Sequence, residues 1–225
     1  LEAAAYVLGT GADPKLEETA DALIDLIARV QQRDGYLNTY FTLAEPGRRW
    51  TNLRDQHELY CAGHMIEAGV AYYQATGKRH LLEVVCRLAD QIATVFGRGE
   101  GQLRGYPGHP EVELALVKLY RVTGERRYLE LSRYFIDERG QQPRWFEIEA
   151  ERRGEPPEQR RRYDYTYSQA HLPFRQQTTL EGHAVRALYL LSGAIDVARE
   201  TGDRELLDVC RRLFVHTIRR RMYIT

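Results

Sequence analysis

The sequence has no excess of charge of either sign. Its 225 residues contain 32 Lys and Arg against 32 Asp and Glu, which leaves a formal net charge of zero. Nucleic acids and anionic membrane surfaces attract proteins through a long-range field that such a balance does not produce. We therefore expect no nucleic-acid partner and no membrane partner.

Cysteine is also scarce. Cys61, Cys86 and Cys210 are widely spaced and form no Cys-x-x-Cys pair, which argues against a disulfide framework and against a zinc site built from cysteine pairs. Each of the three lies in an apolar, helix-like run, so we expect buried free thiols. Free thiols fit a reducing compartment, and the expected location is cytoplasmic.

Several other signals are missing. No apolar run is long enough to cross a membrane, no signal peptide is visible, and no segment alternates polar and apolar residues as a half-buried strand would. The sequence also contains no Ser-His-Asp pattern, Gly-rich phosphate loop or dinucleotide fingerprint. These absences leave helix as the regular structure that the sequence supports.

A recurring Thr-Gly pair predicts helical hairpins. Gly is the residue expected in the left-handed conformation just after a helix, and a new helical run starts almost at once, so each pair joins two antiparallel helices. A fourth hairpin is expected from Leu1–Leu8, a turn at Gly9–Pro14, and Lys15–Gln32. The pairs, with the approximate ends of the helices that follow them, are Thr76-Gly77 with Phe96, Thr123-Gly124 with Glu138, and Thr201-Gly202 with Met222.

The two helices of each predicted hairpin differ in character. The first is apolar almost all round, as in Leu59–Tyr73, Val112–Tyr120 and Val185–Ile195, which predicts an inner helix buried on most sides. The second is amphipathic and predicts an outer helix, because its apolar residues recur with helical spacing. In one outer helix these residues are Leu81, Val84, Val85, Leu88 and Ile92.

Helical hairpins of this kind build either an α/α toroid or an open solenoid. The hairpin turns are short, whereas the connections from outer to inner helices are long, at Asp34–Asn38, Arg98–Gly108 and Gly140–Thr178. Long loops on one face usually carry function, and the short regular period of a solenoid is missing. We predict an all-α fold, a partial (α/α)6 toroid built from about four helical hairpins.

Three of the predicted inner helices begin at a histidine: His57, His109 and His183. All inner helices run in the same direction, so a toroid would bring these helix starts together at one rim. An imidazole at a helix N-terminus is biased towards its neutral form and can both donate and accept hydrogen bonds. The sequence therefore predicts one shared site for a ligand rich in hydroxyl groups, that is, a carbohydrate.

The residues around these histidines carry further expectations. Asp55 is the expected N-cap of the first helix, His109 that of the second ahead of Pro110, and Thr178 with Glu181 forms a capping box for the third. Tyrosines in or near the same loops would stack on a sugar face. They are Tyr36, Tyr60, Tyr106 and Tyr167.

Simpler roles for these residues stay open. A single histidine at a helix start is usually a cap or a surface group, and zinc is disfavoured because no helix carries an HxH or HxxxH pair. His64 lies seven residues after His57 and is predicted to be a core residue. Glu58 and Glu111 are expected to serve the helix dipoles. No Asp or Glu has a clear case as the catalytic acid, although glycosidases generally need two carboxylates.

Five motifs stand in the order in which one known family carries them. They are Gln32–Leu37 (QRDGYL), His57–His64 (HELYCAGH), Gly108–Leu116 (GHPEVELAL), Gly182–Arg186 (GHAVR) and Arg221–Thr225 (RMYIT). With these motifs the chain resembles, over essentially its whole length, the β-L-arabinofuranosidases of glycoside hydrolase family 127. The resemblance implies an (α/α)6 toroid and a retaining exo-glycosidase that releases terminal β-L-arabinofuranose from glycans.

The resemblance also assigns roles. By motif match, His57, His109 and His183 would be substrate-binding residues. The family uses a zinc-bound Cys nucleophile and a Glu acid/base, and both follow the segment that matches Arg221–Thr225. We therefore expect no catalytic residue, metal ligand or cofactor within this segment, with the zinc of the full-length proteins held beyond residue 225.

These inferences predict that residues 1–225 are a fragment of a single α/α-toroid glycoside hydrolase catalytic domain. The chain opens with a Leu inside an apparent helix, which fits a piece of a longer protein. We expect its partners to be L-arabinofuranose-containing glycans, the chain to be inactive alone, and exposed toroid surface to cause self-association. Two alternatives are another α/α-toroid sugar enzyme, such as an epimerase or an unsaturated-glucuronyl hydrolase, and a non-catalytic glycan-binding or degenerate family member.

Overall fold

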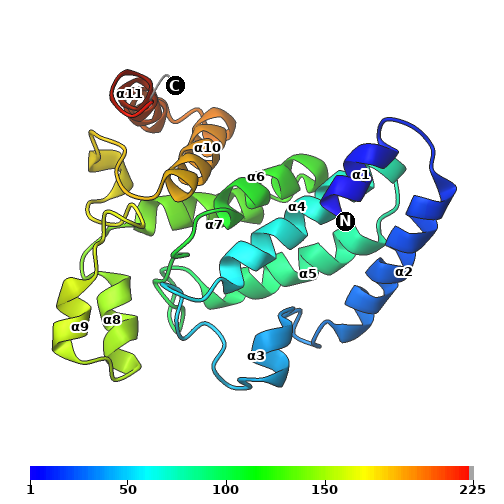
Figure 1. Ribbon diagram of the computed structural model, residues 1–225, viewed down its shortest axis with the longest axis horizontal. Helices are drawn as coiled ribbons and strands as arrows, with labels where there is room; N and C mark the ends of the chain where they lie inside the picture. Colours follow the sequence, from blue (N-terminus) through cyan, green and yellow to red (C-terminus); the bar gives the residue numbers. More distant parts are fainter. Residues whose placement is uncertain (223–225) are drawn as a thin grey trace.

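The structure, a computed structural model, describes residues 1–222, and the last three residues of the Arg221–Thr225 motif lie outside the described part. Over residues 1–222 the regular structure is helical, with one isolated bridge between Phe96 and Leu103 (Figure 1). The predicted all-α class is confirmed. The elements are α1 (Glu2–Leu8), α2 (Pro14–Val30), α3 (Thr39–Leu43), α4 (Glu58–Thr76), α5 (His80–Val95), α6 (Val112–Thr123), α7 (Arg126–Glu138), α8 (Trp145–Arg152), α9 (Pro157–Arg162), the 3-10 turn η1 (Phe174–Gln176), α10 (Ala184–Thr201) and α11 (Arg204–Arg220).

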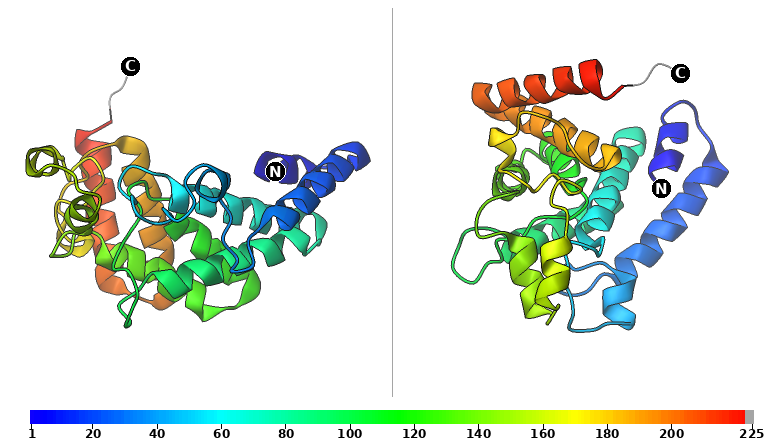
Figure 2. Two further views of the ribbon diagram at one scale, coloured as in Figure 1. Left: turned by 90° about the horizontal axis from the view of Figure 1, so that it is seen from below. Right: turned by 60° about the vertical axis from the view of Figure 1, so that its left-hand side comes forward.

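The helices form two rows, as a partial α/α toroid requires. The first members of the four predicted hairpins, α1, α4, α6 and α10, lie side by side in that order, and each contacts the next. Their partners α2, α5, α7 and α11 pack against them on the outside. Figures 1 and 2 show the α1–α2 and α10–α11 hairpins at opposite ends of the row.

The Thr-Gly pairs end the inner helices as predicted. Gly77, Gly124 and Gly202 have φ angles of 75°, 76° and 68°, and each N–H donates to a carbonyl in the last turn of its helix. This left-handed conformation is strained for residues with a Cβ. The glycines therefore reverse the chain within a few residues and set each outer helix antiparallel to its inner helix.

The apolar residues of α5 behave as their spacing predicts. Leu81, Val84, Val85, Leu88 and Ile92 are all at most 1% exposed. They face the inner row, which leaves the polar side of α5 to solvent. The core of the fold therefore lies between the two rows of helices.

Two features of the fold differ from what the sequence predicts. The long connections contain short helices that the sequence does not indicate, α3 before α4 and α8, α9 and η1 between α7 and α10. The inner helix α10 is not buried on most sides, because Val185 and Leu188 are 49% and 47% exposed. This helix is the last of the inner row, so one of its flanks has no neighbouring inner helix in residues 1–222.

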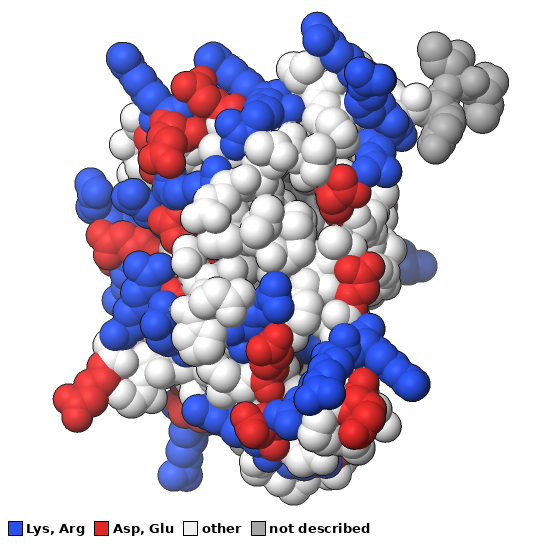
Figure 3. Space-filling model, turned by 90° about the vertical axis from the view of Figure 1, so that its left-hand side faces the viewer, with Lys and Arg blue, Asp and Glu red and all other residues white. Residues whose placement is uncertain are grey.

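The surface is consistent with the balanced charge. Figure 3 shows Lys and Arg interspersed with Asp and Glu over the face that carries α8, α9 and α11, with an uncharged band between them. Mixed charges of this kind produce no single-sign field on that face. None of the described helices combines the length and the apolar character that a membrane crossing requires.

Candidate functional site

The three predicted histidines come together at the N-terminal ends of three inner helices. The ring centroids of His57 and His109 are 5.8 Å apart, and those of His109 and His183 are 6.1 Å apart. They come from the starts of α4, α6 and α10, which are consecutive inner helices. The convergence that the sequence predicts is therefore present in the structure.

The histidines are held differently from the predicted caps. His57 and His183 are themselves the N-caps of α4 and α10, and the Nδ1 of His183 accepts from the Arg186 N–H at 3.4 Å. The cap of α6 is Glu111, two residues after His109. The capping predictions for Asp55, His109 and Thr178 with Glu181 are therefore wrong. Loops that approach from other elements decide where each helix starts.

Further rings complete a cluster around the three histidines. Tyr60 lies 4.4 Å from the ring centroid of His109 and 4.6 Å from that of His64, and Tyr167 lies 5.5 Å from that of His183. Two of the four predicted tyrosines, Tyr60 and Tyr167, therefore line the cluster. We call His57, Tyr60, His64, His109, Tyr167, His183 and Tyr189 the ring cluster.

Two members of the ring cluster are not predicted by the sequence. His64 is expected in the core, but its side chain is 36% exposed and sits against Tyr60. Tyr189 lies 5.9 Å from His109 between ring centroids and looks, by spacing, like one more apolar position of an inner helix. The position of His64, about two helical turns after His57, is a sequence signal that places it on the same face of the helix. No sequence signal indicates that Tyr189 belongs to the cluster.

Two predicted sugar-stacking tyrosines are instead core residues. Tyr36 and Tyr106 are each 1% exposed. The Tyr36 hydroxyl donates to Glu58 at 2.5 Å, and the second carboxylate oxygen of Glu58 accepts from the Trp50 N–H at 2.8 Å. Burial is the main cause that raises the Glu58 pKa to about 7. Glu58 therefore links the loop that carries Tyr36 to the loop that carries Trp50, a role beyond the expected interaction with the helix dipole.

The backbone just before His109 is clamped from three sides. The Gly108 N–H donates to the Leu53 carbonyl at 2.8 Å, and Arg186 donates to the Gly108 carbonyl at 2.9 Å. Arg139 donates to the Pro107 carbonyl at 2.8 Å. These bonds tie the loop to the segment before α4, to α10 and to the end of α7. They place His109 between the other two histidines.

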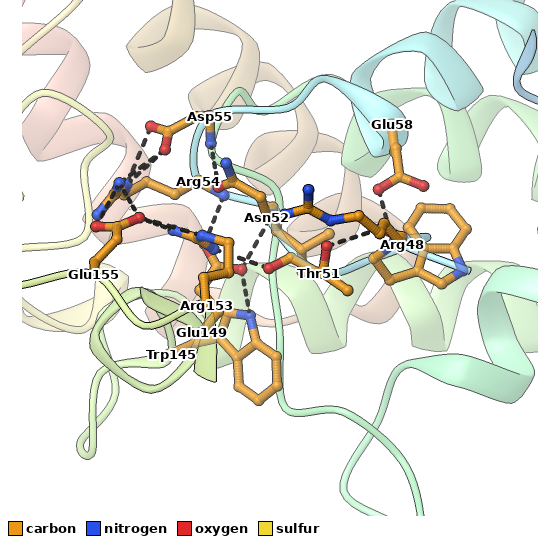
Figure 4. A network of polar contacts seen from close by, with 12 residues as sticks. Arg48, Thr51, Asn52, Arg54, Asp55, Glu58, Trp145, Glu149, Arg153 and Glu155 are labelled. Carbon is orange, nitrogen blue, oxygen red and sulfur yellow. Dashed lines mark hydrogen bonds and ion pairs between the residues drawn. The ribbon is translucent and has the colours of Figure 1, made fainter. Parts of the chain in front are cut away.

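A buried carboxylate supports the segment that leads to His57. Glu149 of α8 accepts from the N–H groups of Leu53 and Arg54, both at 2.9 Å, and from the Trp145 indole at 3.1 Å (Figure 4). Arg54 in turn pairs with Glu155 at 2.9 Å. The segment that contains α8 and α9 thus stabilises the loop between α3 and α4.

The loop before His183 is held by an unusual glutamine. Gln169 is fully buried with a φ of 53°, and its side-chain amide donates to the carbonyls of Glu181 and Tyr167 at 2.9 and 3.2 Å. The left-handed conformation is uncommon outside glycine and persists where the surroundings demand it. Gln169 therefore fixes Tyr167 and His183 relative to each other.

The electrostatics keep the centre of the cluster uncharged. Burial is the main cause that lowers the pKa of His109 to about 4, and the positive charge of Arg186 acts in the same direction. The Nδ1 of His109 lies 2.8 Å from the Pro110 carbonyl, which can only accept. The ring is therefore neutral at neutral pH, with Nδ1–H donating and Nε2 left as an acceptor.

The described residues do not form a zinc site. Within residues 1–222, no three His, Cys, Asp or Glu side chains come together in a way that could hold a metal ion. The cysteines lie on three different helices and are not uniformly buried as predicted, since Cys61 is exposed and Cys86 is half-buried.

Comparison with known proteins identifies relatives of the whole chain. The chain is 45% identical to a non-reducing end β-L-arabinofuranosidase of Bifidobacterium longum subsp. longum, over 100% of this chain and 35% of that protein. The crystal structure of a GH127 β-L-arabinofuranosidase from Geobacillus stearothermophilus T6 matches with 57% identity and a TM-score of 0.97, covering 100% of this chain and 35% of that one. A second GH127 β-arabinofuranosidase structure matches with 39% identity and a TM-score of 0.84, over 96% and 32%.

The chain thus spans about a third of the length of the relatives it matches. The model of the family described as "Beta-L-arabinofuranosidase, GH127 catalytic domain" matches residues 1–225. The order of the hairpins and the all-helical architecture agree with that match. The chain belongs to the GH127 β-L-arabinofuranosidase catalytic-domain family of glycoside hydrolases.

Proposed function

We propose that this chain forms one wall of the sugar-binding pocket of a β-L-arabinofuranosidase. In this proposal His57, His109 and His183 contact the terminal L-arabinofuranose of a glycan. The observation that carries the proposal is the convergence of the three rings, 5.8 and 6.1 Å apart, from three separate helix starts. Core packing alone gives no reason for three imidazoles at or just before the starts of successive inner helices.

The chemistry of the cluster suits a sugar. His109 presents an Nε2 acceptor, because its Nδ1–H donates to the Pro110 carbonyl. His183 uses Nδ1 as an acceptor for the Arg186 N–H, so its Nε2 carries the proton and can donate. A sugar hydroxyl both donates and accepts. Tyr60 and Tyr167 supply aromatic surface beside these two rings, on which the face of a sugar ring can stack.

We propose further that the chain binds the sugar but does not hydrolyse its glycosidic bond. The family resemblance assigns the acid/base Glu, the Cys nucleophile and the zinc ligands to sequence outside residues 1–225. None of Cys61, Cys86 and Cys210 matches those motifs. The reaction of the whole protein, release of terminal β-L-arabinofuranose with retention, is therefore proposed for the protein to which this wall belongs.

Calorimetry with L-arabinose tests the binding proposal. The wild-type chain should release or absorb heat, and His109→Ala should abolish the signal because it removes the central acceptor. His80→Ala is a matched control, since His80 is 54% exposed on the outer helix α5 and pairs with Asp25 at 3.1 Å. Absence of heat with the wild type would contradict sugar binding. Arabinose release by the purified chain in the presence of zinc would contradict the proposed inactivity.

We also propose that the chain associates with a second copy of itself. Val185 and Leu188 of α10 are about half exposed, as are three apolar residues of α11, and exposed apolar surface favours association. Leu188→Lys should lower the apparent mass in sedimentation at high concentration. A wild-type mass that stays monomeric at every concentration would contradict this. The exposed residues of α11 are Phe214, Val215 and Ile218.

A further inference from the structure

Glu111 is a buried carboxyl group that the proposed sugar contacts leave unexplained. It is the N-cap of α6, its side chain is 0% exposed, and within the described residues no protein group hydrogen-bonds to either carboxyl oxygen. Burial of an ionised carboxylate without a donor is strongly unfavourable. A carboxyl group in this position is expected to be neutral or to act on a neighbouring group.

The neighbouring helix has a notch that accommodates this carboxyl group. Gly63 lies inside α4, and a Cβ added there would be 1.5 Å from the Oε2 of Glu111 and 2.9 Å from the Cα of Val112. Glycine weakens a helix interior relative to alanine. The missing side chain thus lets α4 and α6 approach closely and seats the Glu111 carboxyl group against α4.

A titratable ring, that of His64, lies close to this carboxyl group. Its Nδ1 lies 3.8 Å from the Oε1 of Glu111, so a small rotation of either side chain makes a hydrogen bond. The His64 ring packs against Tyr60 and Tyr189, at centroid distances of 4.6 and 6.1 Å. Both tyrosines also contact His109. Glu111 therefore lies directly behind the ring cluster.

The charges around Glu111 favour its protonated form. The nearby cation Lys118 is already paired with Glu67 at 2.6 Å. Burial, followed by the negative charges of Glu67 and Glu113, raises the Glu111 pKa to about 9, and Lys118 opposes this only in part. A protonated carboxyl group is a hydrogen-bond donor. The titratable and charged groups that face it are Glu2 on α1, Tyr60, Cys61, His64 and Glu67 on α4, Glu113 and Lys118 on α6, and Tyr189 on α10.

We propose that Glu111 is the positioning residue of His64. Its carboxyl O–H donates to the Nδ1 of His64 and holds the ring in the tautomer that carries its proton on Nε2. His64, the fourth imidazole of the ring cluster, thereby presents a fixed donor to a sugar hydroxyl. The contact between Glu111 and His64 involves only this chain's own atoms, whereas the sugar contact rests on the proposed function.

Nitrogen NMR of the histidine rings tests the contact without any ligand. In the wild-type chain at pH 7, His64, assigned with His64→Gln, should show an unprotonated, hydrogen-bonded Nδ1 and a protonated Nε2. Glu111→Gln should keep this tautomer, because an amide N–H replaces the carboxyl O–H as donor. Glu111→Leu removes the donor and should give a mixture of both tautomers. Gly63→Ala should do the same, because its Cβ displaces the carboxyl group.

A matched variant of another buried carboxylate serves as the control for the contact between Glu111 and His64. Glu138→Gln changes another buried carboxylate, which pairs with Arg98 and Arg104 away from the ring cluster, and it should leave His64 unchanged. A wild-type His64 that is doubly protonated, protonated on Nδ1 or tautomerically mixed would overturn the proposal. So would a folded Glu111→Leu chain with an unchanged His64. L-arabinose should then shift the Nε2 signal; its failure to perturb any ring in the cluster would count against the sugar site alone.

Discussion

Removal of one buried cation should destabilise both the fold and the site. Arg139 follows the last turn of α7 and is fully buried. Its guanidinium donates to Glu113 at 3.0 Å, to the Pro107 carbonyl at 2.8 Å and to the Ser168 carbonyl at 2.9 Å. We predict that Arg139→Met, which keeps most of the side-chain length, lowers the free energy of unfolding substantially.

The expected size of this effect follows from the groups left behind. Loss of one partner of a buried ion pair typically costs about 3–5 kcal/mol, because the other charge stays buried. A buried carbonyl that loses its donor costs about 1–3 kcal/mol, partly recovered by relaxation. With two such carbonyls these costs add to about 5–11 kcal/mol before relaxation, and even the lower end is comparable with the whole stability of many domains, about 5–15 kcal/mol. The variant should therefore be close to unfolding at room temperature.

Urea unfolding followed by circular dichroism measures the loss. Adding Glu113→Gln to the variant should recover about 2 kcal/mol or more, because the buried charge disappears while an oxygen remains to accept from the Glu111 N–H. The free energies of the wild type, the two single variants and the double variant form a cycle that isolates the pair. A loss below about 1 kcal/mol for Arg139→Met would refute the reasoning. Equal stability of Arg139→Met and the double variant would also refute it.

Three further outcomes are expected. Folding raises the Glu111 pKa from 4.5 to about 9, so the free energy of unfolding should fall as the pH rises from 5 to 9. Urea unfolding of Glu111→Gln should show a smaller fall over the same range. A pH profile equal to that of the wild type would contradict the raised pKa. Gly108→Ala places a Cβ 2.0 Å from the Arg54 carbonyl and should abolish the heat of L-arabinose binding, whereas Gly11→Ala in the open turn after α1 should not. Retained heat in Gly108→Ala would contradict the role of the loop before His109 in placing that ring. A thiol reagent should modify the exposed Cys61 of the native chain faster than the buried Cys210, even though desolvation raises the pKa of the Cys61 thiol, and equal rates would contradict the structure.

The hairpin architecture could be predicted from the sequence because its signals are local. A left-handed glycine such as Gly77 ends a helix wherever it stands, and the spacing of Leu81, Leu88 and Ile92 identifies a buried face from neighbours within a few turns. The helix starts were less predictable. Glu111 and His183 are caps because distant segments hold the loops before them, and no local pattern reports those contacts.

The sequence alone determined the helical hairpins, the family, and the three histidines that converge. Only the tertiary structure decided what surrounds them, because burial and partners arise from contacts between segments far apart in the chain. Tyr36 and Tyr106 look like Tyr60 in sequence, yet the packing buries the first two and brings the third against His109. The same packing placed Glu111 in the notch at Gly63, where α4 and α6 touch. The sequence predicts each of these helices but not their contact.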